Sequence, residues 1–166
     1  MVCWTRPKNL REYLVRAKLP QAQINRRSLR EKLGFKHCNR NCNLCKNSPR
    51  FTKSILCSTT NEIYPILSSL NCLSTNVIYC ITCTKGSHTC KFKPQYIGMT
   101  KRRVSDRFNE HKYSINPEST KTVGIHFSNN FEMIPFEQVR SKDPWILLSH
   151  EKYYIRKFDP VLNNRM

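Results

Sequence analysis

Residues 77–111 bring together several side chains that could do chemistry. The segment contains two short β-rich pieces, VIY and YIG, and each carries a tyrosine, Tyr79 and Tyr96. A helix-like stretch follows, in which Arg107 and His111 are spaced by about one turn. Between the tyrosines lie three cysteines and a histidine, which are common metal ligands. The segment therefore combines aromatic hydroxyls, a guanidinium and potential metal ligands in one short stretch of chain.

A carboxylate in the middle of an apolar helix face is a second chemical signal. Asp143 and Pro144 predict the N-cap and the first residue of a helix. Four residues of this helix share one face: Leu147, Glu151, Tyr154 and Phe158. Burying a carboxylate is unfavourable unless it is paired or binds a cation. Taken alone, Glu151 fits a cation ligand and a surface residue paired with a lysine equally well.

Arg107 and His111 also have ordinary explanations. The helix that contains them has an apolar stripe at helical spacing, formed by Val104, Phe108, His111 and Ile115. Arg107 borders this stripe and is by itself best explained by a surface salt bridge with Asp106 or Glu110. His111 lies on the stripe and is by itself best explained as a hydrogen-bonded core histidine. Neither residue alone therefore indicates a site.

The charge of the chain points to a polyanionic partner. The 166 residues include 29 Lys and Arg against 11 Asp and Glu, a net charge of +18. So much positive charge destabilises a compact state by self-repulsion, and nucleic acid is the first candidate partner. An anionic membrane surface is the alternative, but the chain has no signal peptide and no apolar run of about twenty residues. We therefore expect a nucleic acid and no membrane partner.

Residues 1–36 are predicted to form a basic arm. Residues 1–50 contain 13 Lys and Arg but only two acidic residues, so they hold +11 of the net charge. Asn9 is a candidate N-cap, and the helical spacing of apolar residues after it ends at Pro20. The arm is expected to be partly helical. The alternative is a solvated tail without a partner.

The cysteines favour metal binding over disulfides. Their number, nine, is odd, and the chain has two C-x-x-C pairs and no secretory signal, so a secreted disulfide scaffold is disfavoured. Cys38, Cys42 and Cys45 are close enough for one loop to wrap a tetrahedral zinc ion. The candidates for the fourth ligand are Cys72, Cys57 and His37, of which Cys72 is preferred. The alternative is three free cysteines on a basic loop.

From Phe51 onward the chain is predicted to be rich in strands. Short apolar or alternating runs are separated by Asn, Ser, Pro and Gly, and they read FTKSIL, EIYPIL, NVIYCITC and QYIGM. FEMIPFEQV predicts an edge strand, because Pro135 cannot donate to a ladder. TVGIHF predicts another short helix. These elements predict a fold that combines short strands with helices.

Four of these segments, in this order, resemble the GIY-YIG nuclease family. VIY stands where the family has GIY, with Val77 in place of the first glycine, and Tyr96-Ile97-Gly98 is the YIG. YIGMTKRRVSDRFNEH resembles the family's helix with R-x-x-x-H, and EKYYIRKFDPVLN resembles its glutamate helix followed by P-x-L-N. The resemblance covers Val77 to Asn163 and implies an α+β fold: a small three-stranded antiparallel sheet flanked by helices, here preceded by a zinc knuckle and a basic helical arm. The replaced glycine is a backbone position, so the tyrosine beside it keeps its implied role.

A fuller resemblance is to the endonuclease domain of Penelope-like retroelements. RPKNLREYLVRAKL resembles the segment that joins their reverse transcriptase to the nuclease, and CNRNCNLC resembles their upstream cysteine knuckle. Cys80, Cys83, His111 and His126 resemble their C-C-H-H set, which implies a second zinc site. On an extended strand Cys80 and Cys83 would point to opposite faces, so they can share a metal only if the strand ends by Thr82. The alternative is two small core cysteines.

The resemblance implies a role for each site residue. Glu151 would hold one Mg²⁺ or Mn²⁺, which are cations that prefer oxygen ligands. Arg107 would grip phosphate oxygens, and His111 is a candidate catalytic neighbour. Either Tyr79 or Tyr96 would be the base that takes a proton from water, provided that a nearby cation and Arg107 lower its pKa. The family's C-terminal asparagine corresponds to Asn163, which would support the site.

The resemblance also implies an activity, partners and a division of the chain. The expected activity is metal-dependent hydrolysis of DNA, nicking a target site for retroelement insertion. The expected partners are DNA and, further, the element's RNA and a reverse transcriptase domain, and the expected location is the nucleus. The expected divisions are a basic arm (1–36), a knuckle with a β-rich connection (37–72) and a nuclease domain (73–166). The alternative function is a non-catalytic, zinc-stabilised module that binds nucleic acid.

Overall fold

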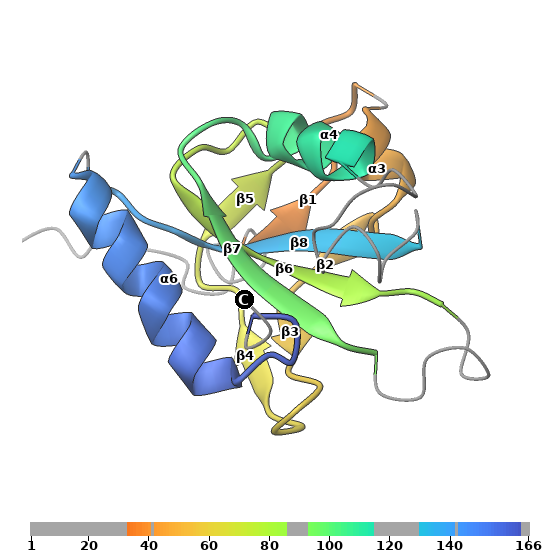
Figure 1. Cartoon of the computed structure of the whole chain (residues 1–166). Coiled ribbons are helices and arrows are strands. Elements are labelled where there is room, and N and C mark those ends of the chain that lie inside the picture. The colour runs from red at the N-terminus through yellow and green to blue at the C-terminus, as the bar shows by residue number, and fades with distance from the viewer. Residues whose placement is uncertain (1–32, 41, 86–92, 115–129, 142, 164–166) are drawn as a thin grey trace, which may run out of the picture. The chain divides into compact units, whose positions relative to one another are not determined.

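A three-stranded antiparallel sheet lies at the centre of the molecule (Figure 1). The computed structural model describes residues 33–40, 42–85, 93–114, 130–141 and 143–163. The predicted helices in the basic arm and in TVGIHF lie outside these residues, as do Ile115 and His126. All described residues belong to one compact unit, Lys32–Met166, which is separate from Met1–Glu31. Among them, no helix combines the length and the apolar character needed to cross a membrane.

The sheet has the order β7-β6-β8, and its strands are β6 (Val77–Cys83), β7 (Gln95–Thr100) and β8 (Phe131–Gln138). Both neighbours are antiparallel to β6. The sequence VIYCITC is rich in β-branched and aromatic residues and is buried along nearly its whole length, as a central strand requires. The predicted α+β fold with a small antiparallel sheet is therefore confirmed.

Strand β8 lies at an edge of this sheet, as Pro135 predicts. Pro135 is paired with Tyr79, next to a register shift between Ile78 and Tyr79. Proline lacks an N–H for the ladder, so it is tolerated at edges and irregular positions of this kind. The irregularity also changes the local twist beside the central tyrosine.

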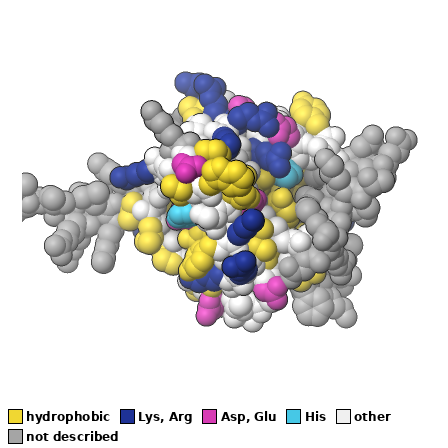
Figure 2. Space-filling model, turned by 60° about the vertical axis from the view of Figure 1, so that its left-hand side comes forward, with side chains coloured by type: hydrophobic (Ala, Val, Ile, Leu, Met, Phe, Trp, Pro, Cys, Tyr) yellow, Lys and Arg dark blue, Asp and Glu magenta, His cyan; other side chains and the backbone are white. Residues whose placement is uncertain are grey.

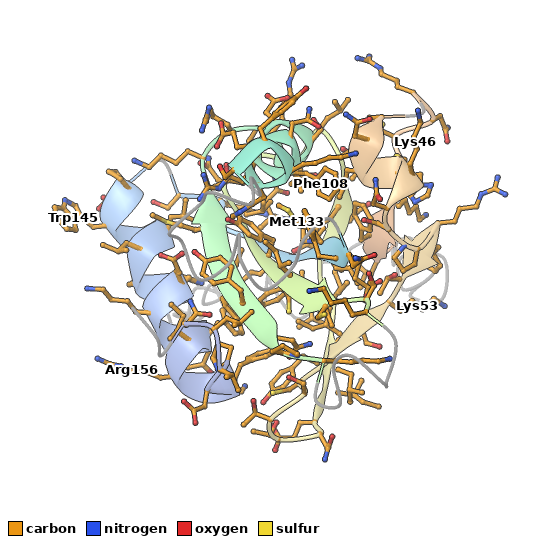
Figure 3. The ribbon with its side chains drawn as sticks, turned by 45° about the vertical axis from the view of Figure 1, so that its right-hand side comes forward. Lys46, Lys53, Phe108, Met133, Trp145 and Arg156 are labelled. Carbon is orange, nitrogen blue, oxygen red and sulfur yellow. The ribbon has the colours of Figure 1, made fainter. Side chains whose placement is uncertain are left out.

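Two helices pack on the sheet: α4 (Val104–Ser114) and α6 (Pro144–Phe158). Phe108 of α4 contacts Phe131 on one face, with ring centroids 5.2 Å apart, and Figure 3 shows Phe108 and Met133 in the space between α4 and the sheet. Tyr154 of α6 contacts Phe136 of β8. Phe136 lies five residues after Phe131 and belongs to the opposite face of the sheet. The side chain of Asp143 accepts a hydrogen bond from the backbone of Trp145, which confirms the predicted N-cap.

The segment before the sheet adds short strands and one short helix. They are β1 (Gly34–Lys36), α3 (Asn43–Lys46), β2 (Phe51–Thr52), β3 (Ser54–Leu56), β4 (Ile63–Pro65) and β5 (Ser69–Asn71). Strands β2, β1 and β5 form a mixed sheet, and β3 pairs with β4. Phe35 and Leu70 are buried in one core cluster with residues of the central sheet. Gly34–Lys36, at the end of the segment assigned to the arm, therefore belong to the folded unit.

Candidate active site and cysteine cluster

Tyr79 lies at the centre of β6, and the backbone of β7 leaves room for its ring. Its side chain is fully buried, and its partner across the ladder is Gly98. A Cβ atom at Gly98 would lie 2.6 Å from the Tyr79 hydroxyl oxygen and 2.8 Å from the ring of Tyr96. The glycine of YIG is thus required by close packing of the two tyrosines, a reason that the sequence alone did not provide.

The hydroxyl of Tyr79 is held by two residues of α4. The distance from Arg107 Nε to Tyr79 Oη is 3.0 Å, and the distance from Tyr79 Oη to His111 Nε2 is 2.8 Å. An arginine N–H can only donate, so the tyrosine oxygen accepts from Arg107 and its own proton can point to His111. Because Arg107 and His111 are one helical turn apart, both reach the same oxygen.

Arg107 also makes the salt bridge that competed with its catalytic interpretation. Its Nη1 lies 2.9 Å from Glu110 Oε2, and Arg102 pairs with the same carboxylate. The hydrogen bond from Arg107 holds the pKa of Glu110 below its ordinary value, and the charge of Arg102 adds to this. The salt bridge and the contact with Tyr79 are therefore made together, and Glu110 fixes the orientation of the half-buried guanidinium.

Tyr96 of β7 and Glu151 of α6 lie near the group formed by Tyr79, Arg107 and His111. The ring of Tyr96 is edge-on to His111, with centroids 6.1 Å apart. Burial raises the pKa of Glu151, while a hydrogen bond with the backbone of Met99 and the charge of Arg107 lower it by less. The charge of Glu151 in turn contributes to raised pKa values at both tyrosines. The carboxylate therefore lies within electrostatic reach of the tyrosine cluster.

The two tyrosines differ from the sequence expectation in their pKa. Burial raises the pKa of Tyr79 above its ordinary value of 10.0, and Tyr96 adds to this increase. Arg107 lowers the pKa of Tyr79, but by less than burial raises it. Burial is likewise the first cause of the raised pKa of Tyr96. Both tyrosines are therefore neutral phenols at rest. To act as a base, either one must first pass its hydroxyl proton to a neighbouring residue.

Asn163 contacts the backbone of β7. Its Oδ1 accepts a hydrogen bond from the Ile97 N–H, and its Nδ2 donates to the Ile97 carbonyl, both at 2.8 Å. The side chain thus attaches the C-terminal turn to the residue that follows Tyr96. The role in catalysis that the resemblance implies for Asn163 stays a prediction.

Cys38, Cys42, Cys45 and Cys72 form a cluster that can hold a metal ion such as zinc. Their sulfur atoms all lie within 4.8 Å of one another, and four of the separations are between 3.2 and 3.7 Å. Tetrahedral zinc with bonds of about 2.3 Å requires sulfur separations of about 3.8 Å. The preferred fourth ligand, Cys72, is therefore part of the cluster.

The other two candidates for the fourth ligand have different partners. The His37 ring is 3.0 Å from the carbonyl of Ser48, and the Cys57 thiol is 3.4 Å from the carbonyl of Phe158.

Within the cluster, burial tends to raise the pKa of Cys38, but the Arg40 backbone and the neighbouring thiols lower it to about 7. A thiol of this kind loses its proton readily, as a zinc ligand must.

The proposed second zinc set is not brought together in the described part of the chain. Strand β6 continues to Cys83, so Cys80 and Cys83 lie on opposite faces. Both are buried in the core. His111 belongs to the tyrosine cluster, and His126 lies outside the described residues. The condition that the strand end by Thr82 is thus not met.

The chain has no match among protein-family models, curated proteins or solved structures. Its similarity to GIY-YIG nucleases therefore rests on the order of its sequence segments. The α+β fold and the cysteine cluster rest on the structure itself. Function must accordingly be inferred from the tyrosine cluster and the charge of the chain.

Proposed function

We propose that the chain is a metal-dependent DNA endonuclease of the GIY-YIG type. The observation that supports this most directly is the Tyr79 oxygen, which lies 3.0 Å from Arg107 Nε and 2.8 Å from His111 Nε2. The carboxylate of Glu151 is partly buried within reach of this group. A module that only binds nucleic acid has no need of a partly buried carboxylate beside two tyrosines.

Glu151 is the residue that would hold Mg²⁺ or Mn²⁺. Its burial raises its pKa, so the ionised form is incompletely compensated by the protein, and its oxygens suit a hard cation. When bound, such an ion supplies Lewis-acid stabilisation of the charge on the phosphate and on the leaving oxygen. The donor atoms at this position therefore fit the cofactor.

The remaining groups supply proton transfer and positive charge. Tyr79 passes its hydroxyl proton to His111 Nε2 and takes a proton from the attacking water, so that hydroxide adds to the phosphorus and the ester oxygen leaves. Arg107 stabilises negative charge on the Tyr79 oxygen and on the phosphate. Glu110 orients Arg107, and Asn163 holds the backbone beside Tyr96.

A nucleic acid is the class of substrate that the charge of the chain favours, and the resemblance specifies DNA. A net charge of +18 attracts phosphates without reading sequence. By the resemblance, the biological reaction is nicking of a nuclear target site for insertion of a Penelope-like retroelement, with element RNA and a reverse transcriptase as further partners. The contacts of Tyr79 with Arg107 and His111 support the cleavage step of this proposal.

A plasmid-nicking assay tests this proposal. Purified protein is incubated with supercoiled plasmid in Mg²⁺, in Mn²⁺ and without a divalent ion, next to Glu151→Gln prepared in the same way. The wild-type protein is expected to nick only with the ion, and the variant is expected to bind DNA without nicking. Wild-type protein that binds DNA but never nicks it would favour the non-catalytic, zinc-stabilised module instead.

A further inference from the structure

The cysteine cluster contacts α4 through the backbone of one of its own members. The carbonyl of Cys72 accepts a hydrogen bond of 3.0 Å from the N–H of Ser105, and the carbonyl of Ser74 accepts one of 3.1 Å from the N–H of Val104. The first N–H groups of a helix lack acceptors within the helix. The segment that begins at Cys72 therefore supplies the acceptors at the start of α4.

A second contact joins the cluster to the middle of α4. Asn43, the residue after Cys42, donates from Nδ2 to Asn109 Oδ1 at 3.1 Å. It begins α3, the short helix that also contains Cys45. The two contacts, at Ser105 and at Asn109, lie on either side of Arg107 in the sequence.

Helix α4 is held in place by several further contacts with the described residues. It has eleven residues, of which Val104 and Phe108 are the buried ones. A helix this short is marginal in isolation, so its position depends on tertiary contacts. Its remaining anchors include the packing of Phe108 and the hydrogen bonds of Arg107 and His111 to Tyr79.

We propose that Cys72 is a positioning residue that links metal binding to the tyrosine cluster. Its sulfur belongs to the metal-binding group, and its carbonyl holds the start of α4. An ion at the cluster fixes this backbone, and the backbone sets where Arg107 and His111 meet the Tyr79 hydroxyl. Removing the ion releases the segment and loosens α4 while the central sheet stays folded. The expected effect on catalysis rests on the proposed function, whereas the expected effect on the position of α4 does not.

Hydrogen exchange of the reduced protein tests this link directly. Exchange of the amides of Val104 and Ser105 is compared with zinc bound, after a zinc-selective chelator, and after zinc is added back. Without zinc these two amides are expected to exchange about tenfold faster, the effect of losing a hydrogen bond or two. The amides of the β6–β7 ladder are expected to change little, and added zinc should restore protection.

Two variants control for the route of the effect. Cys72→Ser keeps the carbonyl but loses the ligand, and is expected to behave like the chelated protein even in added zinc. Asn43→Ala keeps all four cysteines, and is expected to bind zinc and to keep the protection of Val104 and Ser105. Metal content is measured for each protein, with Co²⁺ absorption as an independent signal of thiolate ligation.

Two outcomes would overturn the inference. One is unchanged exchange at Val104 and Ser105 after zinc is removed; the other is opening of α4 and the β6–β7 ladder together, which indicates only general stability. If wild-type protein nicks DNA, the zinc-free form in Mg²⁺ should lose about 10²-fold in kcat while DNA affinity stays similar. Absence of nicking in every form contradicts the proposed function and leaves the exchange result intact.

Discussion

At the scale of single residues, the Tyr79 hydroxyl is distinguished from that of Tyr96 by its contacts. Arg107 and His111 both hydrogen-bond to Tyr79, whereas Tyr96 contributes its ring to the packing around His111. We predict that Tyr79→Phe lowers the single-turnover nicking rate by about 10²–10³, the effect of removing a general base or a charge stabiliser. Tyr96→Phe should have a much smaller effect.

The pH–rate profile gives the second measurement for this pair. Tyr79→Phe should flatten the rising limb of the wild-type profile, because it removes the group that takes the proton from water. Tyr96→Phe should leave its shape unchanged. A greater loss with Tyr96→Phe would assign the base to Tyr96, and equal losses would contradict the distinct role given to Tyr79.

Arg107 acts through a fork of donors that lysine lacks. It reaches Tyr79 with Nε and Glu110 with Nη1, two directions from one planar group. Arg107→Lys is therefore predicted to lose about 10²–10³ in nicking rate while DNA affinity changes little. Arg102→Lys is the matched control, because Arg102 pairs with the same Glu110 but is mostly exposed. Full activity in Arg107→Lys would show that only the positive charge matters, and a similar loss in both variants would trace the effect to the salt bridges with Glu110 instead of the contact with Tyr79.

Glu151 makes a prediction that needs no enzymatic assay. Burial raises its pKa above the ordinary 4.5, so the folded state binds this proton more tightly than the unfolded state. Its stabilising contribution is complete below pH 4.5 and is lost as pH rises through the folded pKa. In zinc-bound protein without Mg²⁺ or Mn²⁺, Glu151→Gln should therefore raise the Tm at neutral pH and have little effect at pH 4.

Added Mg²⁺ provides the control for this measurement. It should raise the Tm of the wild-type protein by favouring ionised Glu151, and it should leave Glu151→Gln unaffected. A variant that is equally or less stable than wild type at neutral pH, with zinc bound but without Mg²⁺ or Mn²⁺, would mean that the protein itself compensates the charge of Glu151 and that this residue does not need a cation.

The sequence singled out Arg107, His111 and Glu151 as candidates, but it did not predict all of their contacts. Spacing placed Arg107 and His111 one turn apart, and the apolar stripe singled out Glu151. In the sequence, a salt bridge with Glu110 was an alternative to a catalytic role for Arg107. In the structure, the same guanidinium contacts both Glu110 and Tyr79. Sequence spacing cannot give the depth of a side chain, which is why the raised pKa of Tyr79 was not foreseen.

At the scale of elements, the pairing of β6 with β7 depends on Gly98. Because a Cβ there would lie 2.6 Å from the Tyr79 hydroxyl and 2.7 Å from its ring, Gly98→Ala should destabilise the protein by about 1–3 kcal/mol, as overpacking does. Urea unfolding measures the change. Combined with Tyr79→Leu, the same substitution should cost less, although the 2.8 Å contact with the ring of Tyr96 remains, and a cost that is unchanged in the double mutant would exclude the contact with Tyr79 as its cause.

Long elements were predictable from the sequence, and the shortest were not. The cap at Asp143, the run VIYCITC and Pro135 each carry a strong local signal, and α6, β6 and β8 agree with them. FTKSIL was expected to be one strand, but it divides into β2 and β3, which pair with different partners. Strands of two or three residues show no periodicity, and their pairing is decided by distant segments such as Ser69–Asn71.

At the scale of the whole molecule, positive charge is divided between the N-terminal unit and the folded remainder. Residues 1–31 contain eight Lys and Arg and two Glu, or +6 of the net +18. Figure 2 shows Lys and Arg side chains at several places on one face of the described residues, near exposed hydrophobic groups. Both parts are therefore expected to contribute to non-specific attraction for DNA.

Deleting residues 1–31 tests how much of DNA binding belongs to the basic arm. The boundary follows the structure, because Phe35 is buried in the core and a deletion through residue 36 would damage the fold. Each phosphate contact that is lost should reduce the slope of log affinity against log salt by about 0.9. We predict a shallower slope and weaker binding for all DNA sequences, with the rate of nicking by bound protein little changed.

A second protein, whose arm keeps its length but has its eight basic residues replaced by Gln, should match the deletion. A slope equal to that of the full chain would show that the arm is a solvated tail and that the folded unit alone binds DNA.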